Sequence, residues 1–389
     1  MREVTIVGAG LSGLVAAIAC AGEGLEVRLL EAHDQLGGRA RTEDGPYKAN
    51  LGPHAAFGDG PFWSWLTENG VLPAHATPSV TGGRLRVRGE LRRTPPLTSL
   101  PSVLRLRGRS APVETSFHEW ACRHVDEPVA AMLGSAAGVY AFHHDPGRFS
   151  AAFIWERTRR VLLDMPTPVR YVVGGWGSLV ASLERGARER GVRIETGARV
   201  DALPAGVVIV ATELEQAAVL LGERLAWPSG NAVCIDVCLA SAKGDPAFVS
   251  DLDDAGWVSR YSKTDPTLAP DGHDLVQGQI GIRPDESVEQ AGARLEQLFD
   301  LGFDGWRERT QWRRRQVMTA RTGALDEPGM TWRERPRVDR GDGVFLCGDR
   351  VAAPGLLAEV SWASAIEAAR GAAAQLHAHS LGRVATRTG

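Results

Sequence analysis

Three glycines near the N-terminus have the spacing that binding of a dinucleotide requires: Gly8, Gly10 and Gly13. Gly8 permits a tight turn, Gly10 lets the backbone approach a pyrophosphate, and Gly13 lets the next helix pack closely on its strand. Eighteen residues after Gly13, Glu31 can accept hydrogen bonds from both ribose hydroxyls of an adenosine. Because a hydrophobic strand pattern precedes the turn and a helical pattern follows it, the motif predicts dinucleotide binding.

Two further runs carry residues that could bind the rest of such a cofactor. Leu36-Gly-Gly-Arg39-Ala-Arg41 follows Glu31 closely, and near the C-terminus Val344-Phe-Leu-Cys-Gly-Asp349 precedes Gly355-Leu-Leu-Ala-Glu359. Together with the glycine motif, these runs resemble the flavin-dependent amine oxidase, protoporphyrinogen oxidase and phytoene desaturase superfamily. Three looser stretches are most similar to its phytoene-desaturase-type branch, at residues 50–54, 169–179 and 262–272.

The resemblance implies a non-covalently bound FAD. It implies that Asp349 binds the ribityl hydroxyls and that the helix start at Gly355 places N–H groups near the flavin pyrimidine. It also implies that Arg39 lies near the pyrophosphate or flavin, and that the backbone of Val200 meets the adenine. The resulting FAD site comprises Gly8, Gly10, Leu11, Ser12, Gly13, Glu31, Ala32, Gly38, Arg39, Leu51, Gly52, Pro53, His54, Val200, Gly348, Asp349, Gly355, Leu356 and Leu357.

The elements that would position these residues start with a strand at 3–7, a helix at 11–23 and a strand at 26–30. This opening favours a parallel sheet covered by helices. We predict an α/β fold, in which a doubly wound Rossmann-like FAD-binding domain is interleaved with a mixed α+β substrate-binding domain. Further strands of the first domain are expected at 192–194, 198–202, 207–210 and 343–348, and a helix from Gly355 to about Leu376.

Both domains are expected to be discontinuous. The FAD-binding domain would comprise residues 1–57, 166–212 and 338–380, and the substrate-binding domain residues 58–165 and 213–337, followed by a flexible tail at 381–389. The second domain is predicted to contain a hairpin at 84–93, helices over 115–165 and at about 286–299, strands at 232–240 and near 315–321, and segments of unassigned type near 273–282.

The composition excludes several other classes. The first strand begins almost at once, which predicts no secretory signal, and the apolar run at 14–21 is far shorter than the ~20 residues of a membrane span. Five scattered cysteines without a CxxC pair predict a cytoplasmic protein with reduced thiols and no metal site. A net charge of −3 and the lack of a nucleic-acid-binding module give no reason to expect nucleic acid as a partner.

Hydride transfer to a flavin needs no metal and no nucleophile, and the sequence has neither a GxSxG nor an HExxH motif. It needs a substrate carbon held about 3–3.5 Å away in a dry pocket. Because the three looser stretches resemble the desaturase branch, the leading interpretation is dehydrogenation, or desaturation, of a hydrophobic small molecule. Oxygen or a quinone would accept the electrons, since no second GxGxxG for NADPH is present. The alternatives are an amine oxidase that releases an imine and hydrogen peroxide, and a non-redox flavoprotein acting as an isomerase, a cyclase or a binding partner.

Lysine is rare, because 41 of the 44 basic residues are arginine and only Lys48, Lys243 and Lys263 are lysine. Amine oxidases of the superfamily often keep a lysine near the flavin, and Lys263 is the one in a plausible region. Its neighbours resemble the desaturase branch, which weakens the amine oxidase interpretation. The candidates for the substrate pocket are His54, Tyr261, Lys263 and Trp332, and no residue is assigned as the acid or base.

Residues 84–109 hold eight arginines and one glutamate, a local charge of +7, with leucines at 97, 100, 104 and 106 between them. The favoured interpretation is a solvated hairpin and loop. The alternative is a peripheral membrane-surface patch through which a lipophilic substrate enters.

Overall fold

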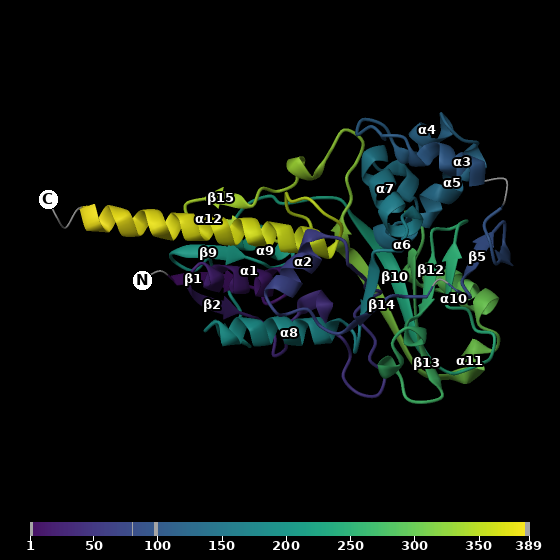
Figure 1. The fold of residues 1–389 in the computed structure, drawn as a ribbon, viewed down its shortest axis with the longest axis horizontal. Coiled ribbons are helices and arrows are strands. Elements are labelled where there is room, and N and C mark those ends of the chain that lie inside the picture. Colours follow the sequence, from purple (N-terminus) through teal and green to yellow (C-terminus); the bar gives the residue numbers. More distant parts are fainter. Residues whose placement is uncertain (1–2, 80, 97–99, 386–389) are drawn as a thin grey trace.

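The computed structural model describes residues 3–79, 81–96 and 100–385, and its strands form three sheets. Figure 1 shows two halves side by side, with the N-terminal strands and the long last helix in one, and a larger sheet under a group of helices in the other. Both chain ends lie at the outer end of the first half. Segments far apart in the sequence therefore meet within each half.

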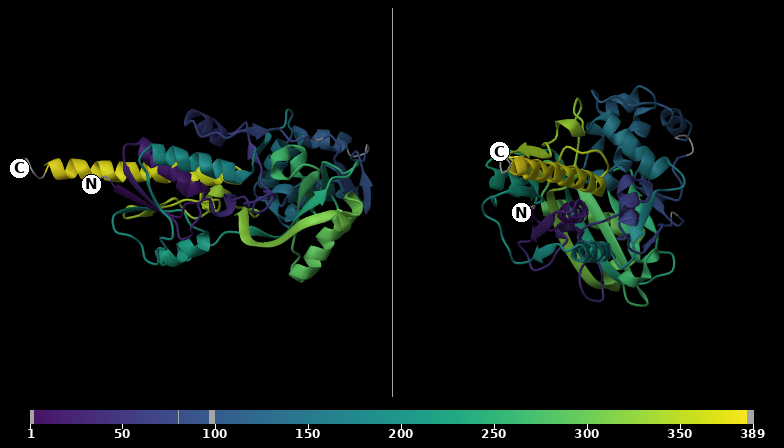
Figure 2. Two further views of the ribbon diagram at one scale, coloured as in Figure 1. Left: turned by 90° about the horizontal axis from the view of Figure 1, so that it is seen from below. Right: turned by 60° about the vertical axis from the view of Figure 1, so that its left-hand side comes forward.

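The first half contains a six-stranded sheet in the order β15-β16-β9-β1-β2-β8. Neighbouring strands are parallel except for the β15–β16 pair. Helix α1 packs between α8 and α12, and the three helices share one hydrophobic core with the sheet (Figure 2). The elements are β1 (Glu3–Val7), α1 (Leu11–Gly22), β2 (Glu26–Leu30), α8 (Trp176–Glu189), β8 (Arg193–Glu195), β9 (Val207–Val210), α9 (Leu214–Leu221), β15 (Asp339–Gly341), β16 (Val344–Leu346) and α12 (Ala358–Ala385).

The second half contains a seven-stranded sheet in the order β14-β10-β13-β12-β11-β5-β6. Helices α10 and α11 cover one face of its long strands, and a second core unites the helices between residues 100 and 158. The third sheet is small and has the order β3-β7-β4, with both pairs antiparallel. Helix α2 (Pro61–Glu68) packs on α12 and belongs to the core of the first half. The other elements are β3 (Ala56–Phe57), β4 (His75–Ala76), β5 (Arg84–Val87), β6 (Glu90–Arg92), α3 (Leu100–Arg107), α4 (Phe117–Cys122), α5 (Glu127–Ala136), α6 (Gly138–Ala141), α7 (Ala151–Thr158), π-helix η4 (Arg159–Leu163), β7 (Val169–Val172), β10 (Ser229–Ala240), β11 (Phe248–Asp251), β12 (Trp257–Arg260), β13 (His273–Gly281), α10 (Val288–Gly302), α11 (Trp306–Arg309) and β14 (Thr310–Ala324).

The predicted α/β fold is confirmed, since the parallel sheet draws strands from both ends and the middle of the chain. The strand predicted at 198–202 is wrong. Ala198 N–H donates to the carbonyl of Glu31 at 2.8 Å, but the residues that follow join no sheet. The exact domain boundaries stay a prediction.

The last helix also differs from the prediction at both ends. It begins at Ala358 rather than Gly355, because Gly355 and Leu357 have φ of +121° and +52°, which a right-handed helix cannot include. It continues to Ala385, past the expected end near Leu376. Part of the predicted tail at 381–389 is thus helical, and residues 386–389 lie outside the described residues.

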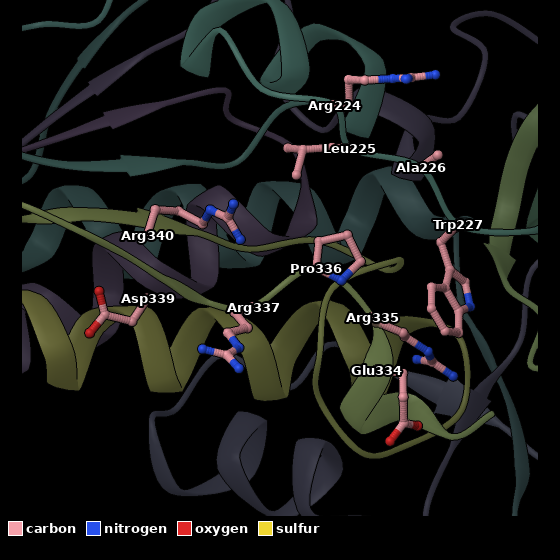
Figure 3. A pocket seen from close by; sticks show the side chains of 10 residues that line it. All are labelled: Arg224, Leu225, Ala226, Trp227, Glu334, Arg335, Pro336, Arg337, Asp339 and Arg340. Atoms are coloured by element: carbon pink, nitrogen blue, oxygen red, sulfur yellow. The ribbon is translucent and has the colours of Figure 1, made fainter.

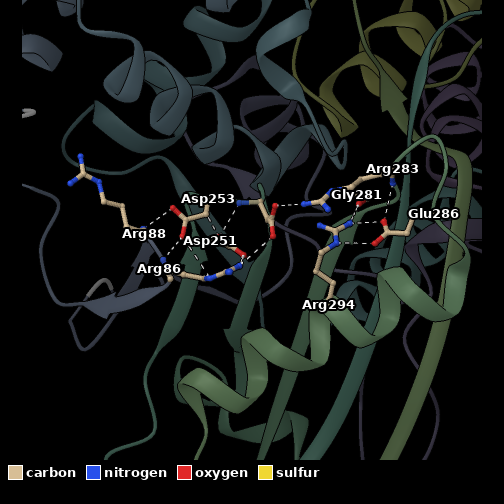
Figure 4. A network of polar contacts seen from close by, with 10 residues as sticks. Arg86, Arg88, Asp251, Asp253, Gly281, Arg283, Glu286 and Arg294 are labelled. Atoms are coloured by element: carbon tan, nitrogen blue, oxygen red, sulfur yellow. Dashed lines mark hydrogen bonds and ion pairs between the residues drawn. The ribbon is translucent and has the colours of Figure 1, made fainter.

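The predicted hairpin around Gly89 is present as β5 and β6, and acidic residues contact its Arg86 (Figure 4). Arg86 donates to Asp251 Oδ2 at 2.8 Å, and Asp253 accepts the backbone N–H groups of Arg88 and Gly89. Two more arginines of the +7 segment have carboxylate partners, Arg92 with Glu90 and Arg107 with Asp164. Leu97 of the predicted patch lies outside the described residues.

Candidate FAD site

The turn between β1 and α1 is built so that only glycine fits at two of its positions. Gly8 has φ of +100°, and a Cβ there would lie 2.7 Å from the carbonyl oxygen of Ala211. A Cβ on Gly13 would lie 1.9 Å from the carbonyl oxygen of Gly8. At Gly10 a Cβ would meet nothing within 4 Å, so the space above the backbone is open. The turn therefore combines a tight helix–strand contact with an accessible backbone.

The N-terminus of α1 has the donors that an anion requires. No side chain caps it, and its first turn contains no acidic residue. The first N–H groups of an α-helix have no partner within the helix, and they lie at the positive end of its dipole. Leu11, Ser12 and Gly13 therefore fit a pyrophosphate as the sequence predicts.

Glu31 lies at the carboxyl end of β2 and is 7% exposed. Its Oε2 accepts the N–H of Ala9 at 2.8 Å, and its Oε1 accepts the N–H of His33 at 3.0 Å. These bonds fix the carboxylate beside the glycine turn and leave each oxygen with further acceptor capacity. Val200 lies shortly after Ala198, whose N–H donates to the Glu31 carbonyl, so the predicted ribose and adenine residues are neighbours.

Arg39 joins segments from three parts of the chain. Its guanidinium donates to Asp349 Oδ2 at 2.7 Å, to the carbonyl of Arg321 at 2.7 Å, and pairs with Glu213 Oε1 at 2.9 Å. Burial alone would raise the pKa of Asp349, but the charge and hydrogen bond of Arg39 outweigh it and lower that pKa. Asp349 is therefore an acceptor held in its ionised form next to Gly348.

Glu213 and Arg321 are members of this cluster that the sequence analysis missed. Glu213 follows β9 closely, and acids at the carboxyl ends of parallel strands are the residues to expect at such a site. Arg321, near the end of β14, had no local signal to distinguish it from the other arginines.

The loop from Asn50 to His54 is anchored on both sides. The carbonyl oxygen of Asn50 accepts hydrogen bonds from Gln277 at 3.1 Å and Arg314 at 2.6 Å. Its side-chain oxygen accepts from the backbone N–H of Trp176 and from Thr42 Oγ1, both at 2.8 Å. The loop is thus connected to the seven-stranded sheet and to the start of α8.

His54 packs against an aromatic cluster at the end of this loop. Its ring lies 4.7 Å from the ring of Trp176, and its Nδ1 lies 2.7 Å from the carbonyl oxygen of Gly52. The buried Trp176 Nε1 has no acceptor within the described part of the chain. Tyr261 is buried and stacks on Tyr171 with ring centroids 4.6 Å apart. An acceptor on a bound ligand would satisfy the indole donor, which fits a cofactor at this place.

A buried ion pair lies beneath the loop. Asp236 on β10 is fully buried and accepts hydrogen bonds from Arg314 at 2.6 and 2.9 Å, from Gln277 at 2.8 Å and from Gln316 at 2.9 Å. Burial raises the pKa of Asp236, although Arg314 opposes the shift. Arg314 also pairs with Glu43. The sequence analysis did not identify this cluster.

The other two pocket candidates lie elsewhere. Lys263 Nζ donates to the carbonyl of Thr81 at 2.8 Å in an exposed position. Trp332 lines a surface hollow of about 660 Å³ beside β15, which adjoins the arginine-rich hollow of about 550 Å³ in Figure 3. The structure brings Tyr261 next to His54. Lys263 shares the short 3-10 helix Tyr261–Lys263 with Tyr261, but its ammonium binds Thr81, and Trp332 lies at the surface hollow. Their roles stay predictions.

His54 predicts a dependence of stability on pH. Burial lowers its pKa to about 4, and the bond to Gly52 O offsets this only in part. In the unfolded chain the His54 side chain takes up a proton near pH 6.5, whereas in the folded protein it stays neutral down to about pH 4. The contribution of neutral His54 to the unfolding free energy is therefore full above pH 6.5 and is lost as the pH falls toward 4. In His54→Gln, we expect the loss of unfolding free energy between pH 7 and pH 5 to be smaller by about 1–2 kcal/mol. Urea unfolding at both pH values measures it.

His273→Gln is the control, because His273 is only partly buried at the start of β13. An equal change in the two variants would contradict the assignment to His54.

Part of the chain is similar to known nucleotide-binding sequences. Residues 6–68 match the family model described as NAD(P)-binding Rossmann-like domain. The L-amino-acid oxidase of Trimeresurus stejnegeri is 57% identical over 56 residues, which are 13% of this chain and 11% of that protein. The matched segment thus spans about a tenth of the length of this relative.

Solved structures resemble the chain over nearly its whole length. An oxidoreductase from Methanosarcina mazei has a TM-score of 0.76 at 16% identity, covering 94% of this chain and 99% of that chain. Cyclohexylamine oxidase from Brevibacterium oxydans has a TM-score of 0.71 at 17% identity, covering 96% and 99%. At these identities the similarity concerns the fold. No described helix is long and apolar enough to cross a membrane.

Proposed function

We propose that the chain is an FAD-dependent oxidoreductase of the amine oxidase superfamily, since its fold is similar to that of cyclohexylamine oxidase and its residues 6–68 match a Rossmann-like domain. The observation that carries the proposal is the open β1–α1 turn with Glu31 fixed beside it. Arg39 and Asp349 extend the same row of polar groups along the carboxyl ends of the parallel strands. This is where open α/β sheets bind their ligands.

FAD, when bound, would accept a hydride from the substrate and pass the electrons to oxygen or a quinone. The first N–H groups of α1 would bind the pyrophosphate, and Glu31 would bind the adenosine ribose. Arg39 holds Asp349 ionised, so that its carboxylate can accept hydrogen bonds from ribityl hydroxyls. His54 and Trp176 would exclude water from the neighbouring space.

For the substrate, we propose first a hydrophobic small molecule that is dehydrogenated. The aromatic rings of Trp176, Tyr171 and Tyr261 near the Asn50–His54 loop favour apolar contact. Lys263, which an amine oxidase would use near the flavin, binds Thr81 instead. One C–H bond would lose a hydride to FAD and the adjacent C–H bond a proton to solvent, which leaves a C=C bond.

The second candidate is oxidation of an amine to an imine, with hydrogen peroxide formed from oxygen. One observation favours it: Gln277 and Gln279, on the same face of β13, each have a buried side-chain oxygen without a donor among the described residues. Buried acceptors of this kind favour a ligand with N–H groups. The oxidases similar to this chain are named for amino-acid and cyclohexylamine oxidation.

Absorbance spectroscopy of the purified protein tests whether it binds FAD and which class of substrate it oxidises. A flavin absorbance spectrum is expected, and a colourless protein that takes up no added FAD would contradict an FAD-dependent function. The protein is then mixed anaerobically with hydrocarbons, with primary amines and with amino acids. The class of compound that bleaches the flavin absorbance is the class that the protein oxidises. Peroxide release from amines would favour the second candidate. Bound FAD that none of these substrates reduces would favour the non-redox alternative.

Glu31→Gln is expected to weaken FAD binding by about 10- to 100-fold, because the charge-assisted bonds to the ribose lose about 1.5–3 kcal/mol. Equilibrium dialysis or fluorescence titration of the apoprotein with FAD measures the change. Glu26→Gln, at an exposed position of the same strand, is the control and should bind like the unaltered protein. Unchanged affinity in Glu31→Gln would contradict the ribose assignment.

Peripheral membrane contact through residues 84–109 stays a proposal that depends on α3 and the residues just after it. Leu104 is 65% exposed, and Arg105 and Arg109 are exposed beside it. If this surface binds anionic lipid, replacing Arg105, Arg107 and Arg109 together by glutamate should abolish sedimentation with phosphatidylserine vesicles. Sedimentation that persists in this variant, or that is absent from the unaltered protein, would remove the proposal.

A further inference from the structure

Two arginines from the helical layer of the second half bind the start of α12. Arg157 Nη2, at the end of α7, donates to the carbonyl oxygen of Gly355 at 2.8 Å. Arg160, in π-helix η4, donates through both Nη atoms to Glu359 at 2.7 Å. Glu359 Oε2 in turn accepts the N–H of Leu356 at 3.0 Å. Residues 355–359 are therefore held by side chains from a distant part of the sequence.

The segment needs such support, because its backbone is strained. Leu357 has φ of +52°, a conformation that costs a non-glycine residue about 1–2 kcal/mol. Strain of this kind persists where the surrounding contacts over-determine the backbone, and it is concentrated at ligand sites. The segment that supplies Arg160 is a π-helix, and π-helices are also common at functional sites.

The charges of the two arginines are balanced differently. Arg160 pairs with the carboxylates of both Glu359 and Asp59. The Arg157 side chain is 11% exposed, donates to the carbonyl of Phe153 at 3.1 Å and lies 3.8 Å above the ring of that residue. Its ion-pair partner, Glu156, is 3.8 Å away with its own side chain 78% exposed, and the charges of Asp326 and Arg335 also act on Arg157 with opposite signs. A buried charge with so little compensation is costly unless an anion completes it.

We propose that Arg157 is a positioning residue that raises the reduction potential of the bound flavin. It holds the carbonyl of Gly355 and places a buried positive charge next to this residue. The inference rests on the proposed function and on the sequence resemblance, which implies that this segment lies at the flavin pyrimidine. A positive charge there stabilises the anionic reduced ring relative to the oxidised ring. Because the effect is on an equilibrium, it is measurable without any substrate.

The test compares Arg157→Met, Arg157→Gln and Arg157→Lys in the FAD-loaded protein. The Met variant removes the charge, the Gln variant keeps a donor for the Gly355 carbonyl without the charge, and the Lys variant keeps the charge. Arg188→Met is the control, because Arg188 is exposed on α8 and pairs with Glu184 at the surface. The measurements are the midpoint potential by dye equilibration and the affinity for sulfite, followed by the loss of flavin absorbance.

We expect the ratio of reduced to oxidised flavin at a given potential to fall about tenfold in the Met and Gln variants, which equals a shift of about 30 mV for a two-electron couple. Sulfite should bind about tenfold more weakly in both, and Arg157→Lys should recover part of each change. An unaltered potential and sulfite affinity in Arg157→Gln would overturn the proposal, even if the Met variant failed to fold. An unaltered protein that binds no FAD would instead overturn the proposed function itself.

Discussion

Replacing Gly13 by alanine is expected to destabilise the protein by about 3 kcal/mol or more and to remove FAD binding. The added Cβ would lie 1.9 Å from the carbonyl oxygen and 3.0 Å from the carbonyl carbon of Gly8. Both are backbone atoms, so a side-chain rotation cannot relieve the contact. Helix α1 would have to move away from β1, and its first N–H groups would move with it.

Thermal unfolding and FAD titration of the purified variant measure the two effects. Gly22→Ala is the matched control, because Gly22 ends the same helix and a Cβ there would meet nothing within 4 Å. It should be neutral or up to about 1 kcal/mol more stable, as alanine has the higher helix propensity. A Gly13→Ala protein with normal stability and FAD affinity would mean that the turn does not have the described geometry.

The second large effect is expected from Arg314→Met. Asp236 would then be a buried carboxylate without its cation, and breaking one partner of such a pair typically costs about 3–5 kcal/mol. The carbonyl of Asn50 would also lose a donor at 2.6 Å, which loosens the loop that ends at His54. Both lower stability and weaker FAD retention are therefore expected, measured by urea unfolding and by the flavin content after gel filtration.

Arg313→Met is the control on the adjacent residue of the same strand. Arg313 points to the other face of β14, where it pairs with Glu296 and its side chain is 39% exposed. Such surface pairs contribute about 0–1 kcal/mol. The double variant Asp236→Asn with Arg314→Met should recover much of the loss, because no unpaired charge remains buried. If Arg314→Met were as stable as Arg313→Met, the predicted loss of unfolding free energy would be contradicted.

The sequence predicted the structural elements that depend on neighbouring residues, and it failed where an element depends on partners far along the chain. Strands β1, β2 and β9 and helix α1 follow from local hydrophobic periodicity and their bounding glycines. The short strand predicted at 198–202 was wrong because apolar alternation over a few residues does not distinguish a strand from a loop that packs beside a sheet. The start of α12 was misplaced because the positive φ at Leu357 depends on distant partners rather than on its own side chain.

By itself the sequence determined the glycine turn proposed to bind the nucleotide, because Gly8, Gly10, Gly13 and Glu31 lie within one βαβ unit whose geometry follows from their spacing. Only the tertiary structure decided which of the 41 arginines bind groups in distant parts of the chain. Arg39 meets Asp349 across 310 residues, and Arg157 meets Gly355 across 198. A long, freely rotating guanidinium carries no local preference for one carboxylate or carbonyl over another. Its partner is selected when the packed sheets and helices place one acceptor within reach.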